Sequence, residues 1–80
     1  MRKYQMVAYK NIGGNSGVTA YECGADYIRV LFSTGAVYLY TYRSAGSSNI
    51  EHMKMLAQSG VGLNSFIKRE VKKLYEERER

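Results

Sequence analysis

The sequence predicts an α+β fold in which a small antiparallel sheet of three or four strands is followed by two helices. Three observations predict it. Side chains in the first half alternate with a period of two, which is typical of strands, whereas apolar residues in the second half recur at helical spacing. Proline is absent, so the eight glycines mark the bends. A chain of 80 residues has room for one core, so residues 1–80 are expected to form a single domain.

The strand segments lie in the first half of the chain. We expect an edge strand at residues 4–9 and a short strand at residues 18–22, with a glycine-rich loop at residues 11–17 between them. The clearest pattern covers residues 27–42, where two alternating runs flank a Thr-Gly pair at 34–35. Glycine accepts the positive φ of tight hairpin turns, so a two-residue turn is expected there.

A two-residue turn would set the pairing of the two hairpin strands. The expected opposite pairs are Phe32 with Val37, Val30 with Leu39, and Ile28 with Thr41. These side chains would form the buried face, because successive side chains of a strand point to opposite sides of the sheet. The other face would carry Tyr27, Arg29, Leu31, Tyr38, Tyr40 and Tyr42.

That second face would be a flat aromatic and cationic platform, which we call the tyrosine platform. Nucleobases stack on such surfaces, and each stack on a single strand contributes about 1 to 3 kcal/mol. The alternative is that tyrosine is simply a good strand former, or that a helix or a second subunit covers this face.

The helices lie in the second half of the chain. The first is expected to begin at Ser48, because Ser48 and Glu51 match a capping box, and to end near Gly60. The second is expected to begin at Asn64 or Ser65. Its expected buried stripe is Phe66, Ile67, Val71 and Leu74, and its expected basic face is Lys68, Arg69, Lys72 and Lys73.

Two features of this half could bind an anion. The loop at residues 59–65 carries glycines into a helix N-terminus, where free backbone N–H groups and the helix dipole can hold a phosphate. It could equally join two capped helices with nothing bound. The basic face of the second helix could follow a nucleic-acid backbone, although interleaved glutamates also suit a solvated surface.

The candidate ligand-binding residues therefore come from the hairpin, the glycine loop and the second helix. They are Tyr27, Arg29, Tyr38, Tyr40, Tyr42, Ser59, Gly60, Gly62, Asn64, Ser65, Lys68 and Arg69. The net charge of +5 includes basic residues near both ends, among them Arg2 and Lys3. Such a charge is compatible with a polyanionic partner and is also common among small proteins.

Several classes of protein are disfavoured. Cys23 and His52 are the only cysteine and histidine, so the chain offers neither a disulfide nor a set of ligands for zinc. Neither Cys23 nor His52 has an evident acid or nucleophile beside it in the sequence, so we expect no enzyme activity, no metal and no cofactor. No apolar run approaches membrane-spanning length and no signal peptide is evident, so we expect no membrane contact and a cytoplasmic location.

Two spaced motifs resemble those of the KTSC domain, a short module found at the C-terminus of some lysyl-tRNA synthetase-like proteins. The first is Phe32-x-x-Gly35-x-Val37-Tyr38-x-Tyr40, and the second is Ala57-x-Ser59 followed by Asn64-x-x-Ile67-Lys68. The opening of the family pattern is matched by Ser16-x-Val18-x-Ala20 and Tyr27-x-x-Val30-x-Phe32. The resemblance covers roughly residues 16–75.

The chain departs from the family pattern at two places. Residues 42–49 replace a Val-Pro that usually precedes the first helix, and residues 60–63 stand where an aromatic pair is usual. The resemblance implies an α+β fold and an association with RNA or nucleic-acid metabolism. The short form is similar to small proteins carried by phages and prophages.

These observations predict a non-catalytic binding module for a nucleotide-type anionic ligand, either nucleic acid or a small nucleotide. The alternative is a phage-type interaction protein that inhibits a host protein or sequesters a cyclic nucleotide of immune signalling. A homo-oligomer is also expected, because a domain of 80 residues with an exposed tyrosine face has reason to pair.

Overall fold

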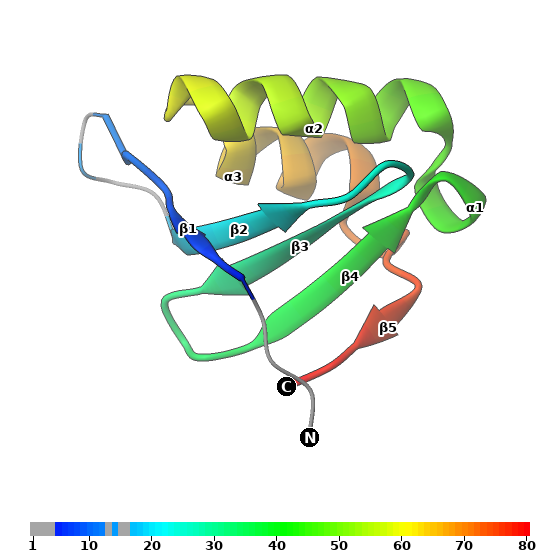
Figure 1. The fold of residues 1–80 in the computed structure, drawn as a ribbon, viewed down its shortest axis with the longest axis horizontal. Coiled ribbons are helices and arrows are strands. Elements are labelled where there is room, and N and C mark those ends of the chain that lie inside the picture. The colour runs from blue at the N-terminus through cyan, green and yellow to red at the C-terminus, as the bar shows by residue number, and fades with distance from the viewer. Residues whose placement is uncertain (1–4, 13, 15–16) are drawn as a thin grey trace.

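The computed structural model describes residues 5–12, 14 and 17–80. Five antiparallel strands form one sheet in the order β1-β2-β3-β4-β5, and the helices lie on one face of it (Figure 1). The elements are β1 (Val7–Ala8), β2 (Val18–Cys23), β3 (Tyr27–Phe32), β4 (Val37–Thr41), α1 (Tyr42–Ala45), α2 (Ser47–Ser59), α3 (Leu63–Phe66), the π-helical turn η1 (Ile67–Val71) and β5 (Glu77–Arg78). The expected α+β class is confirmed, and the sheet has five strands where three or four were expected.

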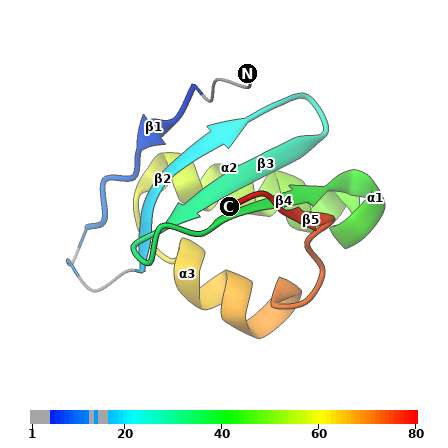
Figure 2. The ribbon, with the colours of Figure 1, turned by 90° about the horizontal axis from the view of Figure 1, so that it is seen from below.

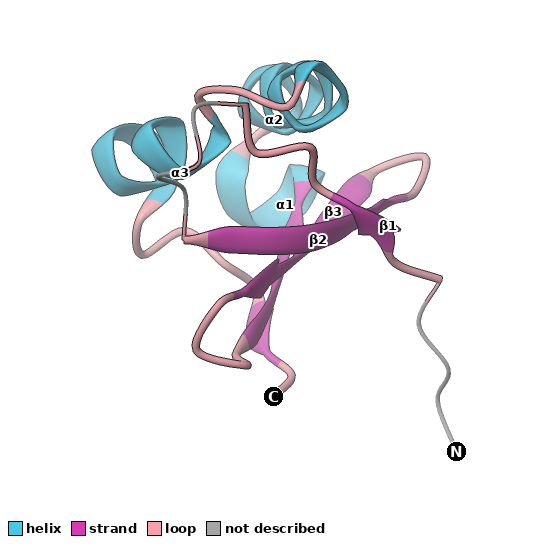
Figure 3. Cartoon of the chain, turned by 90° about the vertical axis from the view of Figure 1, so that its left-hand side faces the viewer, coloured by secondary structure: helices cyan, strands magenta, loops and turns pink. Residues whose placement is uncertain are grey.

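The core lies between two layers. Seen along the sheet, α2 and α3 both lie on the same side of it (Figure 3), and from below the sheet lies across α2 while α3 lies to one side (Figure 2). Apolar residues at helical spacing, Ile50, Met53 and Ala57, turn one side of α2 inward, where all three are buried. Full burial of a side chain such as Ile50 or Leu63 contributes about 1.5 to 3 kcal/mol.

The β3–β4 hairpin pairs one residue out of the expected register. Ile28 lies opposite Tyr40 and Val30 opposite Tyr38. The turn contains three residues, because the backbone N–H of Phe32 donates to the carbonyl of Ala36 at 2.9 Å. Gly35 adopts φ 94°, the left-handed conformation that ends a three-residue hairpin loop and favours glycine.

This shift exchanges the two faces of β4. Side chains alternate along a strand, so a slip of one residue moves every side chain to the other side. Tyr38 and Tyr40 therefore lie on the helix-covered face, where Tyr40 is only 1% exposed, while Val37 and Leu39 lie on the face of Tyr27. The prediction of an exposed tyrosine platform is therefore wrong. Val37 is buried as expected, at 1% exposed, but on the face away from the helices, where Leu39 is half-buried.

The boundaries of α2 are close to those expected, but its capping is different. It begins at Ser47 after Gly46 and ends at Ser59, with Gly60 as a left-handed C-cap, as expected. The capping box expected at Ser48 is absent from that position. The box forms instead at the start of α1, where the Thr41 and Ser44 side chains bond each other's backbone N–H groups.

The second helix is shorter than expected. It begins at Leu63 and ends with η1 at Val71, so Leu74, expected in its buried stripe, is 41% exposed. The chain then returns along the free edge of β4 as β5, with Tyr38 opposite Arg78. Residues 75–80 are mostly charged, so as a helix they would bury little apolar surface, whereas as a strand they pair with the unsatisfied backbone groups of that edge.

The N-terminal segment is partly described. The expected edge strand is present as β1, which pairs with β2, whereas Arg2, Lys3 and Tyr4 lie outside the described residues. Gly13, Asn15 and Ser16 of the glycine-rich loop lie outside them too. Within the described ranges, no helix has the length and apolar character needed to cross a membrane.

Candidate functional site

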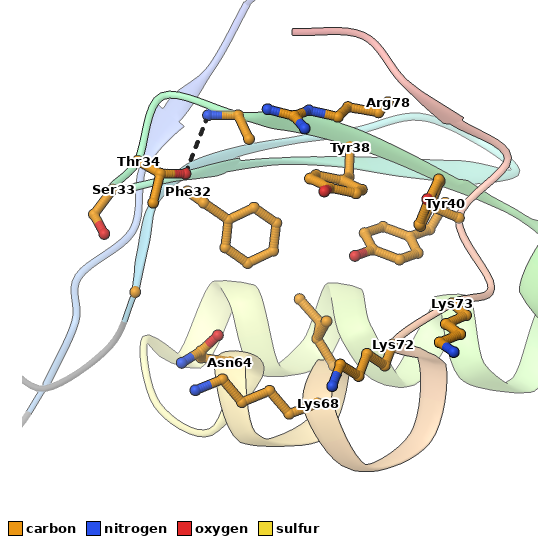
Figure 4. Close-up of a pocket in the computed structure, with 14 residues that line it drawn as sticks. Phe32, Ser33, Thr34, Tyr38, Tyr40, Asn64, Lys68, Lys72, Lys73 and Arg78 are labelled. Carbon is orange, nitrogen blue, oxygen red and sulfur yellow. Dashed lines mark hydrogen bonds between the residues drawn. The ribbon is translucent and has the colours of Figure 1, made fainter.

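A cleft of about 670 Å³ lies between the helix-covered face of the β3–β4 hairpin and the segment α3–η1 (Figure 4). Its lining residues are Gly17, Phe32, Ser33, Thr34, Ala36, Tyr38, Tyr40, Asn64, Ile67, Lys68, Lys72, Lys73, Tyr75 and Arg78. In Figure 4 the aromatic rings come from the sheet side, and Asn64, Lys68 and Lys72 come from the helix side. The cleft thus has an aromatic wall and a largely cationic wall.

The aromatic wall is centred on Tyr38. The Phe32 ring packs edge-on against Tyr38 with 5.6 Å between centroids, and the Tyr75 ring does so at 4.7 Å. The Tyr40 ring lies nearly parallel to that of Tyr38, at 6.5 Å. These contacts hold Tyr38 in one orientation while it stays partly exposed, so it is a preorganised aromatic surface.

Tyr40 is the most deeply buried residue of the aromatic wall, at 1% exposed. Burial raises its pKa far above the ordinary value, and the neighbouring Tyr38 and Tyr75 raise it further. Tyr40 therefore keeps its proton throughout the neutral range. It adds ring surface to the cleft and no negative charge.

The cationic wall comes mostly from one stretch of helix. Lys68 lies on η1, and Lys72 and Lys73 follow directly after it. A π-helical turn has i→i+5 spacing, which brings residues four and five positions apart to one side. All three lysines are exposed, and none forms an ion pair with another described residue.

Arg78 supplies the fourth cation from the sheet side. Its register on β5 places it opposite Tyr38, with the guanidinium carbon 5.7 Å from the centre of the Tyr38 ring. Among the residues that the structure describes, no aspartate or glutamate lines the cleft. Three lysines and one arginine therefore give the lining a formal charge of +4.

The carboxylates that alternate with these cations in the sequence are directed elsewhere. Glu70 pairs with Arg69 at 3.0 Å on the exposed side of η1. Glu76 accepts a hydrogen bond from the Thr41 hydroxyl at 2.7 Å. Neither glutamate lines the cleft, so neither neutralises its lysines.

The two glutamates of the last strand segment lie on the opposite side of the sheet. Because Arg78 points into the cleft, strand alternation turns Glu77 and Glu79 to the other face. There Glu79 pairs with Arg29, with 2.7 Å between Oε1 and Nε. The fold thus sorts a mixed-charge sequence into a cationic cleft and an acidic reverse side.

Four of the residues predicted from the sequence line the cleft, namely Tyr38, Tyr40, Asn64 and Lys68. Tyr27 and Arg29 do not, because they lie on the far face of the sheet. Arg29 is only 6% exposed and pairs with Glu22 as well as Glu79, so it is a structural residue. The Tyr27 ring lies 4.8 Å from its guanidinium carbon.

Tyr42 is engaged outside the cleft. Its hydroxyl donates to Glu51 at 2.6 Å, and the Lys54 ammonium lies 5.8 Å from its ring centre. The hydrogen bond to Glu51 raises the pKa of Tyr42 and lowers that of Glu51. Together these contacts fasten the start of α1 to α2.

The glycine loop has structural contacts rather than a place in the cleft. Gly60 accepts a hydrogen bond from the Ile12 N–H at 2.8 Å, and a Cβ at Gly60 would lie 2.6 Å from that of Lys10. The Ser59 hydroxyl donates to the carbonyl of Leu56. The other candidates outside the cleft are Gly62, Ser65 and Arg69.

Several cleft residues were missed from the sequence. Lys72 and Lys73 belong to the expected basic helix face without being among the candidate binding residues, and Phe32 is expected only in the core, yet all three line the cleft. Tyr75 and Arg78 had no detectable signal, because residues 74–80 are mostly charged and carry no alternating strand pattern. The cue that could have found the lysines is their spacing from Lys68.

The remaining reactive side chain is remote from the cleft. Cys23 is exposed at the end of β2, and partial burial of its sulfur is the main cause that raises its pKa. The thiol is therefore mostly protonated at neutral pH and is a weak nucleophile.

Comparison of the chain with protein-family models, with curated proteins and with solved structures finds no match. The resemblance to the KTSC domain therefore rests on its spaced residues alone and stays a prediction.

Proposed function

We propose that the protein is a non-catalytic binding module that holds a nucleotide-type anion in the cleft between the hairpin and α3–η1. The observation that carries this proposal is the pairing of an ordered aromatic wall with a +4 lining. A base would stack on Tyr38, and phosphate groups would meet the lysines and Arg78.

The composition of the cleft supports binding rather than catalysis. In the described chain no carboxylate or histidine lines it, so the Ser33 and Thr34 hydroxyls have none of the usual general bases beside them in the lining to activate them as nucleophiles. Its volume of about 670 Å³ lies within the range of about 300 to 1,000 Å³ typical of small-ligand sites. Such ligands occur in the cytoplasm, where Cys23 would also stay reduced.

Matched pairs of variants test the proposal. K68Q/K72Q removes two charges from the cleft, whereas R43Q/R69Q removes two exposed charges outside it. Binding of labelled oligonucleotides and of nucleotides is measured at low and moderate salt. Since charge-assisted hydrogen bonds contribute about 1.5 to 3 kcal/mol and 1.4 kcal/mol is tenfold, the cleft variant should bind at least about tenfold more weakly. The control variant should lose little.

A second matched pair separates the two faces of the sheet. Y38L should reduce the binding free energy by the contribution of one base stacked on an aromatic ring, about 1 to 3 kcal/mol. Y27L removes the same ring type from the far face and should leave binding unchanged. Equal losses in Y38L and Y27L, with melting temperatures unchanged, would contradict the assignment of the cleft.

Absence of binding to every nucleotide and nucleic acid would leave the alternative of a protein partner. A homo-oligomer also stays a proposal, now without the exposed tyrosine face that motivated it. Its remaining support is the small core of a domain of 80 residues, and sedimentation at high concentration measures it directly.

A further inference from the structure

The four cations of the cleft form two separate groups. Lys68, Lys72 and Lys73 come from the helical wall, while Arg78 comes from β5 on the opposite side (Figure 4). The glutamates that separate these residues in the sequence are outside the cleft. The positive charge is therefore concentrated at the cleft and is not compensated there by the described side chains.

A ligand with one phosphate can be close to only part of this charge. Among the described residues, a single phosphate placed among the lysines leaves Arg78 with only its contacts to the Tyr38 ring and to the Arg80 carbonyl, which accepts from its Nε at 3.2 Å. One placed at Arg78 leaves the lysines uncompensated. A ligand with two or more phosphate groups can engage both groups while its base occupies the aromatic wall.

The extent of the basic surface favours a small ligand over a long strand. In Figure 4 Ser33, Thr34 and Asn64 lie at one end of the cleft, and none of them is charged. Lys68, beside Asn64, is the charged lining side chain at that end, so a strand that continued past Ser33 and Thr34 would leave the concentrated charge of the cleft. Strands that bind proteins tightly normally follow a continuous basic groove.

Resting on the proposed function, we infer that the cleft selects a small nucleotide carrying two or more phosphate groups over one carrying a single phosphate. Arg78 is the residue that makes this distinction. It is carried by β5, whose position is held by its pairing with β4 and by the contact between Glu79 and Arg29.

The inference is tested by calorimetric titration at physiological ionic strength with adenosine, AMP, ADP and the 5′-phosphorylated dinucleotide pApA. ADP and pApA should bind roughly tenfold more tightly than AMP, because the added phosphate meets a second group of cations. Adenosine should bind most weakly. In R78Q the preference for ADP over AMP should shrink to about twofold, while AMP affinity stays close to that of the wild type.

The matched control for R78Q is R43Q, which removes an exposed arginine outside the cleft and should keep the full preference. Equal affinities for AMP and ADP in the wild-type protein would overturn this inference and leave the proposed function intact. Failure of all four compounds and of oligonucleotides to bind would overturn the proposed function itself.

Long strands provide the last arm of the test. An oligonucleotide longer than the cleft should bind no more tightly than pApA and should show a mild salt dependence. A long strand that binds much more tightly, with affinity falling steeply as salt rises, would overturn the assignment to a small nucleotide.

Discussion

Replacing Arg29 with methionine is expected to destabilise the fold strongly. The guanidinium Nη1 lies 2.5 Å from Glu22 Oε1, and its Nε lies 2.7 Å from Glu79 Oε1. The Arg29 and Glu79 side chains are only 7% and 4% exposed. Methionine keeps most of the apolar stem of arginine, so R29M chiefly takes the positive charge away from two largely buried carboxylates.

The expected loss follows from this burial. Removing one partner of a buried ion pair costs about 3 to 5 kcal/mol. At about 0.05 to 0.15 kcal/mol per residue, a domain of 80 residues has a free energy of unfolding of roughly 4 to 12 kcal/mol. Since 1 kcal/mol shifts the melting temperature of a domain this small by about 4 to 8 °C, R29M should melt at least about 12 °C lower.

The assay is urea unfolding followed by circular dichroism, with R69M as the control. Arg69 also pairs with a glutamate, but the side chains of that pair are 64% and 47% exposed, so R69M should cost less than about 1 kcal/mol. Adding E22Q and E79Q to R29M should recover part of the lost free energy of unfolding, because these substitutions remove the two carboxylate charges that R29M leaves without their arginine. A free energy of unfolding for R29M within about 1 kcal/mol of that for R69M would refute the reasoning.

Two further predictions concern the hairpin and the buried tyrosine. G35A should lower the free energy of unfolding by about 1 to 2 kcal/mol, because Gly35 has φ 94° and a Cβ there would meet nothing within 4 Å, so the penalty is purely conformational. S33A in the same turn should lower it less. Equal losses of unfolding free energy for the two variants in urea would contradict this. Tyr40 keeps its proton above the pH near 10 at which an unfolded tyrosine loses it, so the free energy of unfolding should fall as pH rises above about 10. Y40F should show a shallower alkaline fall, and parallel pH profiles for Y40F and wild type would show that Tyr40 does not cause it.

The local elements of this protein follow from its sequence. The alternating runs in residues 27–42 predict a hairpin, and β3 and β4 are found there. Glycine at position 60 predicts the end of the first helix, because a left-handed C-cap needs no Cβ. These features depend on backbone preferences and on side-chain period, which a short stretch of sequence already contains.

The candidate site could be predicted only in part. The place of Lys68 and Asn64 near the start of the second helix predicts a role in binding, and both line the cleft. Tyr38 and Tyr40 were also selected, but for a face of the sheet on which they do not lie. The sequence shows that these residues are aromatic, whereas the face of the sheet on which they lie depends on the length of the β3–β4 turn.

Tertiary structure decided which face the tyrosines take. A two-residue and a three-residue turn both fit the residues around Gly35, and they differ by the one-residue slip that exchanges the faces. It also decided the place of β5, since a charged tail forms a strand only where a free sheet edge and Arg29 meet it. The sequence by itself determined the α+β class, the β3–β4 hairpin, the long helix α2 and the supply of tyrosines and lysines. Their assembly into one cleft required contacts between residues far apart in the chain, which no local pattern encodes.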